Sequence, residues 1–61
     1  MYKHFVMRDN DQNHVVWADG AFHAHILARA AVRDGADVAR VCVVDPAMRL
    51  GFRIIQEVRG E

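Results

Sequence analysis

Four histidines in a chain of 61 residues are the first side chains that suggest chemistry, because neutral imidazole is a common metal ligand. His23 and His25 have a spacing that places two ligands on one face of a strand. The residues around them favour a helix, however, in which positions two apart point about 200° from one another. His4 and His14 fall in strands expected to pair, but neither a cysteine pair nor an HExxH motif accompanies them. The sequence therefore predicts no metal site and no cofactor, and a metal-dependent or pH-responsive histidine protein is only the third hypothesis.

Nucleophilic and acid–base groups are scarce. The chain contains no Ser and no Thr, which excludes Ser and Thr nucleophiles and a P-loop hydroxyl for Mg²⁺. Cys42, the only cysteine, lies in the apolar run VCVV, where burial would keep the thiol protonated and unreactive. Six of the eight acidic residues are Asp, and most stand at expected turns or helix ends, namely Asp9, Asp11, Asp19, Asp34 and Asp45. We therefore expect no catalytic residues and a protein that is not an enzyme.

A basic stripe is formed by His25, Arg29 and Arg33, which repeat at the i, i+4, i+8 spacing of one helix face. Such a stripe could lie along nucleic-acid phosphates, and dimerisation would double it. The alternative is an ordinary solvated helix face, which is the commoner case. Eight Lys and Arg balance eight Asp and Glu, so no strong overall field attracts a polyanion. A nucleic-acid-binding dimer is therefore the second functional hypothesis.

A second kind of contact is predicted at the turn between the last two strands. Met48, Arg49 and Leu50 fall at its tip, and Met and Arg are residue types enriched at protein interfaces. In the competing interpretation Met48 and Leu50 fold back over the core. Trp17 has the same two interpretations, a core position at a strand–helix corner or an exposed binding anchor. These four residues are the predicted partner-binding residues.

The elements that must position these side chains follow from residue type. Aromatic and β-branched residues predict strands at about 2–8, 14–18, 38–44 and 52–58. An Ala-rich helix is predicted over about 21–34, with Asp19 as its N-cap and Gly35 at its end. The order ββαββ predicts one α+β domain over 1–61, with a mostly antiparallel four-stranded sheet and one helix packed on one face. The first and third strands are the most continuously apolar, which favours the strand order 2-1-3-4.

The apolar residues exceed what one helix and one sheet face require. Alternation along the third strand places Val38, Cys42 and Val44 opposite Ala39, Val41 and Val43, so that both faces are apolar. In the fourth strand, alternation places Phe52, Ile54, Gln56 and Val58 on one face. A second copy of the chain would cover the surplus, although a monomer with Val on its open face is the alternative. We expect a homodimer with an interface drawn from Ala28, Val32, Val38, Cys42 and Val44.

The composition, 52% hydrophobic and 26% charged, is that of a globular protein. We expect a cytoplasmic location, because the chain has a single cysteine, no apolar run of about 20 residues and no signal-peptide pattern. In architecture alone the chain is loosely similar to small uncharacterised bacterial and phage domains, and a phage or mobile element is a candidate source. The leading hypothesis is a non-enzymatic regulatory or inhibitory accessory protein that binds another protein. No membrane partner is expected.

Overall fold

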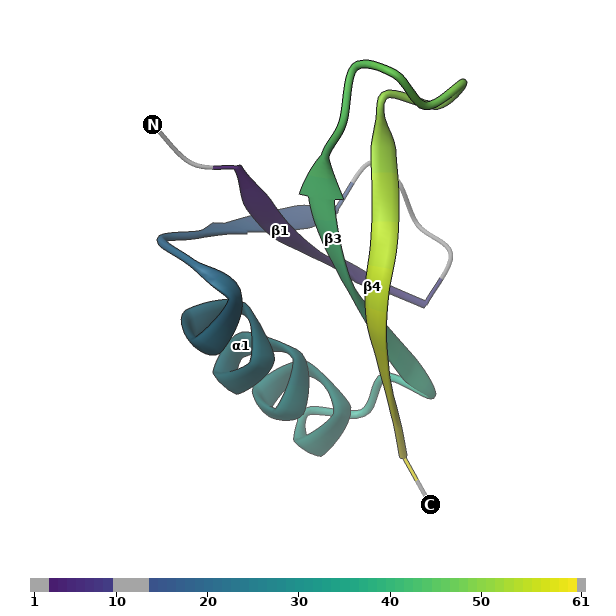
Figure 1. Cartoon of the computed structure of the whole chain (residues 1–61). Helices are drawn as coiled ribbons and strands as arrows, with labels where there is room; N and C mark the ends of the chain where they lie inside the picture. The colour runs from purple at the N-terminus through teal and green to yellow at the C-terminus, as the bar shows by residue number, and fades with distance from the viewer. Residues whose placement is uncertain (1–2, 10–13, 61) are drawn as a thin grey trace.

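A computed structural model describes residues 3–9 and 14–60 of the chain. Its elements in order are β1 (His4–Arg8), β2 (Val15–Ala18), α1 (Ala21–Arg33), β3 (Val38–Val44) and β4 (Phe52–Arg59) (Figure 1). Each lies within two residues of its predicted bounds. The predicted strand residue Tyr2 and the turn residues 10–13 lie outside the described part of the chain.

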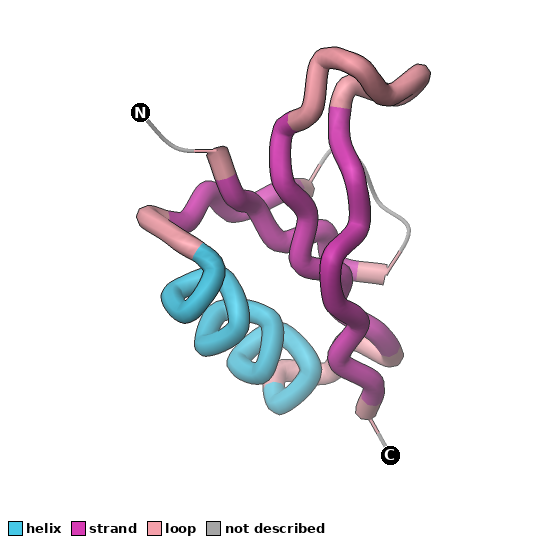
Figure 2. The backbone as a smooth tube through the Cα atoms, viewed as in Figure 1, coloured by secondary structure: helices cyan, strands magenta, loops and turns pink. Residues whose placement is uncertain are grey.

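The four strands form one antiparallel sheet in the order β2-β1-β3-β4, and α1 lies across one of its faces (Figure 2). The predicted α+β class, ββαββ order and strand order are therefore confirmed. The strand order follows from the burial of β1, as its apolar residues predict. The central strand β1 carries three consecutive buried residues, Phe5, Val6 and Met7, which need cover on both faces and both edges.

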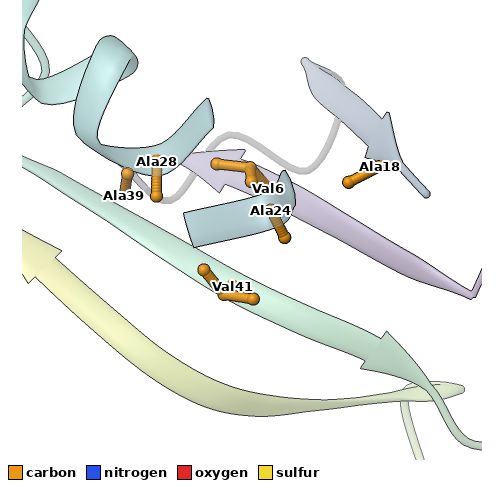
Figure 3. Packing of buried hydrophobic residues seen from close by; sticks show 6 residues of the cluster. All are labelled: Val6, Ala18, Ala24, Ala28, Ala39 and Val41. Atoms are coloured by element: carbon orange, nitrogen blue, oxygen red, sulfur yellow. The ribbon is translucent and has the colours of Figure 1, made fainter. Parts of the chain in front are cut away.

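The core between helix and sheet is built from small side chains. It contains Val6, Ala18, Ala24, Ala28, Ala39 and Val41 (Figure 3). Because four of these six residues are alanines, the helix can lie close to the strands. Leu27, Ala31, Val32 and Val58 pack around this cluster.

The N-terminal end of α1 differs from the prediction, whereas its C-terminal end agrees with it. The N-cap is the extended Gly20 rather than Asp19, and no side chain caps this end. The Asp19 backbone N–H instead donates to His23 Nδ1 at 3.1 Å, so the contact at this end runs from the backbone to an imidazole one turn into the helix. The other end is as predicted. Gly35 has a φ of +114°, and its N–H donates to the Val32 carbonyl, which turns the chain out of the helix.

A β-bulge separates the two halves of β4. Val41 faces Gln56, whereas its neighbour Cys42 faces Ile54, so Ile55 is an extra residue without a Cα partner in β3. Simple alternation, which placed Phe52, Ile54, Gln56 and Val58 on one face, is therefore wrong. Gln56 and Val58 lie on the helix side, while Phe52 and Ile54 lie on the opposite side.

Candidate functional site

The face of the sheet opposite α1 is the most distinctive surface of the described structure. We call it the helix-free face. Its apolar side chains share this side of the sheet by strand register, namely Phe5, Met7, Val15, Trp17, Cys42, Val44, Phe52 and Ile54. Val38, Arg40 and Glu57 lie on the same side, toward the end of the sheet where β4 finishes. All four strands contribute to it. Both the alternation of β1 and β2 and the bulge in β4 are needed to bring these residues together.

Three aromatic rings form the centre of this face. Phe5 lies between Trp17 and Phe52, with ring centroids 5.1 Å and 5.4 Å away and both contacts tilted or edge-on. This is the geometry that aromatic pairs prefer. Phe5 is only 7% exposed because the flanking rings cover it, but Trp17 remains 46% exposed. Val44 and Ile54 beside them are 42% and 46% exposed, so the face is apolar and only half covered.

One ion pair borders the helix-free face. Arg40 and Glu57 face each other across β3 and β4, and Arg40 Nε lies 2.8 Å from Glu57 Oε2. Arg40 Nη1 also donates to the Asp9 carbonyl at 2.7 Å, which ties the end of β1 to β3. The hydrogen bond from Arg40 lowers the pKa of the Glu57 carboxyl, and the Arg59 charge adds to this effect. Beside the apolar surface, the Glu57 carboxylate is thus shared by the guanidinium groups of Arg40 and Arg59.

The predicted partner-binding residues occupy two places. Trp17 belongs to the helix-free face and, being about half exposed, is not a core residue. Met48, Arg49 and Leu50 lie in the β3–β4 turn, which extends from the sheet at the end remote from α1 (Figure 1). Met48 and Leu50 are exposed and do not fold back over the core.

The predicted dimer-interface residues are scattered. Ala28 is fully buried on the side of α1 that packs on the sheet, and Val38 and Cys42 are buried within the sheet. These three residues therefore offer little surface to a second copy. Val32 packs at the edge of the helix–sheet core, and only Val44 is an exposed member of the helix-free face. The rings explain why Cys42 is covered. This burial raises the pKa of the Cys42 thiol, which keeps the thiol protonated and unreactive.

The basic stripe acquires a neighbour that sequence reasoning missed. His25, Arg29 and Arg33 line a groove between α1 and β4, and Arg59 lies on its opposite side. No local motif links positions 33 and 59. Only the pairing of β4 beside β3 brings its last residues to the helix, and Arg59 falls one residue beyond the predicted strand 52–58.

No group of three potential metal ligands among His, Cys, Asp and Glu occurs in residues 3–9 and 14–60. Within the same residues, α1 is too short and too polar to cross a membrane. The comparisons found no matching family model, no similar curated protein and no similar solved structure. The function is therefore inferred from the residues of this chain.

Proposed function

We propose that this chain is a non-enzymatic binding protein that pairs with a second copy of itself through the helix-free face. The observation that carries the proposal is the half-covered apolar centre of that face. Trp17, Val44 and Ile54 keep 42–46% of their surface exposed around the buried Phe5. Aromatic residues of this kind are enriched at the centres of protein interfaces.

The size of the face supports a second copy as its occupant. Four strands spaced by ~4.8 Å, with seven residues at ~3.3 Å each along β3, give a surface of roughly 19 by 23 Å. Two such faces would cover about 900 Å² in projection, and the relief of the rings adds to this. The total approaches the ~1,200 Å² at which specific interfaces begin. A pair of sheets packed face to face is also a standard way to bury two apolar sheet surfaces.

Charge supports the same occupant. The chain has eight positive and eight negative residues, so two copies approach without net repulsion. The charges at the border of the face, Arg40 and Glu57, are already paired within each copy. A two-fold axis would place apolar centre against apolar centre, with Arg40 and Glu57 beside it as an ion pair already formed within each copy.

The proposed dimer acts as an accessory protein that binds other proteins through its two β3–β4 turns. Met48 and Leu50 are exposed there on either side of Arg49, at the end of the molecule remote from the helix. Pairing through the helix-free face leaves α1 and its basic stripe uncovered.

Sedimentation equilibrium tests the pairing. The wild-type chain should sediment at twice 6.9 kDa at micromolar concentration. Ile54→Lys places a charge in the apolar centre and should give the mass of a single chain. Ile26→Lys is the matched control, because Ile26 is 48% exposed, against 46% for Ile54, but lies on α1. This variant should stay dimeric.

A wild-type chain that remains monomeric up to about 100 μM would refute the proposal. So would a dimer that Ile26→Lys disrupts and Ile54→Lys leaves intact. Circular dichroism of each variant shows whether it is folded. If Ile54→Lys is unfolded, Val44→Lys addresses the same surface from the neighbouring strand.

A further inference from the structure

The structure assigns a second binding site to the groove between α1 and the end of β4, and we propose that this groove holds the phosphate backbone of a nucleic-acid strand. The groove has a volume of about 580 Å³. It is lined by His25, Arg29 and Arg33 from the helix and by Arg59 from the strand, and none of its described lining residues is acidic.

Within residues 3–9 and 14–60, the two helix arginines of this groove have no carboxylate partner. Arg8, Arg40 and Arg53 each have a carboxylate partner, whereas no described residue forms an ion pair with Arg29 or Arg33. Arg59 lies 3.2 Å from Glu57, but that carboxylate is 2.8 Å from Arg40 and serves both guanidinium groups. Among the described residues that line the groove, Arg29 and Arg33 therefore have no carboxylate partner, and Arg59 shares one with Arg40.

The spacing of these cations suits a linear polyanion. A rise of 1.5 Å per residue puts Arg29 and Arg33 about 6 Å apart along the helix, and His25 about 12 Å from Arg33. Successive phosphates of one duplex strand advance about 3.4 Å along the axis, so the stripe spans three to four of them. A small anion would need only one arginine, whereas two arginines in line with the imidazole of His25 favour a nucleic-acid strand.

The wall of the groove is held firmly in place. Gly60 N–H donates to the Asp37 carbonyl at 2.9 Å, which fixes the end of β4 beside the helix. A Cβ atom at Gly60 would come within 3.0 Å of Val32 Cγ1, so glycine permits this close approach. Val32 and Val58 supply the apolar part of the groove's lining. The site is complete within one chain and does not depend on dimerisation.

Fluorescence anisotropy with labelled 20-nucleotide DNA, the matching RNA and a 20-base-pair duplex tests the proposal. With three cations engaged, binding should weaken by about 20-fold for single strands and 40-fold for duplex between 50 and 200 mM salt. In the Arg29→Ala/Arg33→Ala double variant the same salt change should weaken the remaining binding only about 3- to 4-fold.

The matched control is Lys3→Ala/Arg53→Ala, which removes the same charge from outside the groove and should keep the wild-type salt dependence. Absence of binding at 20 mM salt, or an equal loss in the control, would overturn the proposal. Binding to vesicles containing anionic lipid without binding to any of the oligonucleotides would overturn it as well. The Ile54→Lys variant should still bind if folded, so failure of the dimer and failure of the groove are distinguishable.

Discussion

At the scale of single residues, Arg40 is a polar side chain that connects several strands. It reaches the carboxylate of Glu57 on β4 and the carbonyl of Asp9 at the end of β1, so it links three strands. Asp9 completes this junction. It adopts a φ of +54°, and its carboxylate accepts the backbone N–H groups of Asp37 and Val38. Asp tolerates this left-handed conformation better than most residues.

The Arg40–Glu57 bond should make stability depend on pH. The pKa of Glu57 is lowered in the folded state, so the bonded carboxylate stabilises the fold above its ordinary pKa near 4.5. This contribution is lost as the pH falls through the lowered folded value. In urea unfolding, wild type should be more stable than Glu57→Gln at pH 6, and the gap should narrow from about pH 5 to pH 3. A gap that stays constant over this range would contradict the role given to Arg40.

At the scale of the elements, the end of α1 depends on glycine. Gly35 has a φ of +114°, which L side chains rarely adopt, although a Cβ there would make only an ordinary contact of 3.7 Å with Arg8. Gly35→Ala should therefore lower the free energy of unfolding by about 1–2 kcal/mol through backbone strain alone.

Gly20, at the other end of the helix, is the control for this prediction. It is extended, and a Cβ atom added there would meet no heavy atom within 4 Å, so Gly20→Ala introduces no backbone strain. It should cost about 0.5 kcal/mol, less than Gly35→Ala, because alanine is a poorer N-cap than glycine. Urea unfolding of the two variants measures the difference. Equal losses would show that the positive φ is not what constrains position 35.

Residue pattern alone was sufficient for most of this architecture. Apolar continuity identified β1 and β3 as the central strands, and Gly35 marked the helix end, because both signals are local. The bulge at Ile55 could not be predicted, since a pattern of period two contains no sign of where one extra residue enters. The N-cap was wrong for a related reason: Asp19 has the right chemistry for a cap, but its backbone N–H is bonded to the His23 imidazole.

The candidate sites were less accessible to sequence reasoning. Surplus apolar residues correctly indicated that the second sheet face is apolar, but the chosen residues Ala28 and Cys42 are buried inside the chain. Which side chains of the helix-free face stay exposed could not be predicted, because it depends on the tertiary contacts of the aromatic rings, such as those of Phe5 with Trp17 and Phe52. Arg59 was missed because it is 26 residues from Arg33 and joins the groove only through strand pairing.

At the scale of the whole molecule, size makes association important. A chain of 6.9 kDa is expected to expose about 4,000 Å² when folded, whereas this one exposes 4440 Å². The excess fits the open helix-free face and the extended β3–β4 turn. If two copies pair, stability must depend on concentration, because only the folded state forms the interface.

Differential scanning calorimetry checks this dependence. A tenfold rise in concentration adds about 1.4 kcal/mol per dimer, or about 0.7 kcal/mol per chain. At ~4–8 °C per kcal/mol for a chain of this size, the Tm should rise by about 3–5 °C. The Tm of Ile54→Lys should not change with concentration. A wild-type Tm that is equally constant would contradict a folded dimer.

The bulge in β4 also affects whether copies of this protein can add to one another without limit. In the described sheet β2 and β4 are the outer strands, and an outer strand that accepts another chain creates a new outer strand, so growth by that route does not terminate. The extra residue Ile55 interrupts the regular ladder of β4, and the charged Arg53, Glu57 and Arg59 lie along the same strand. Both features discourage fibre formation. Association through a face, by contrast, is complete at two copies, which favours a small closed particle over a growing polymer at high concentration.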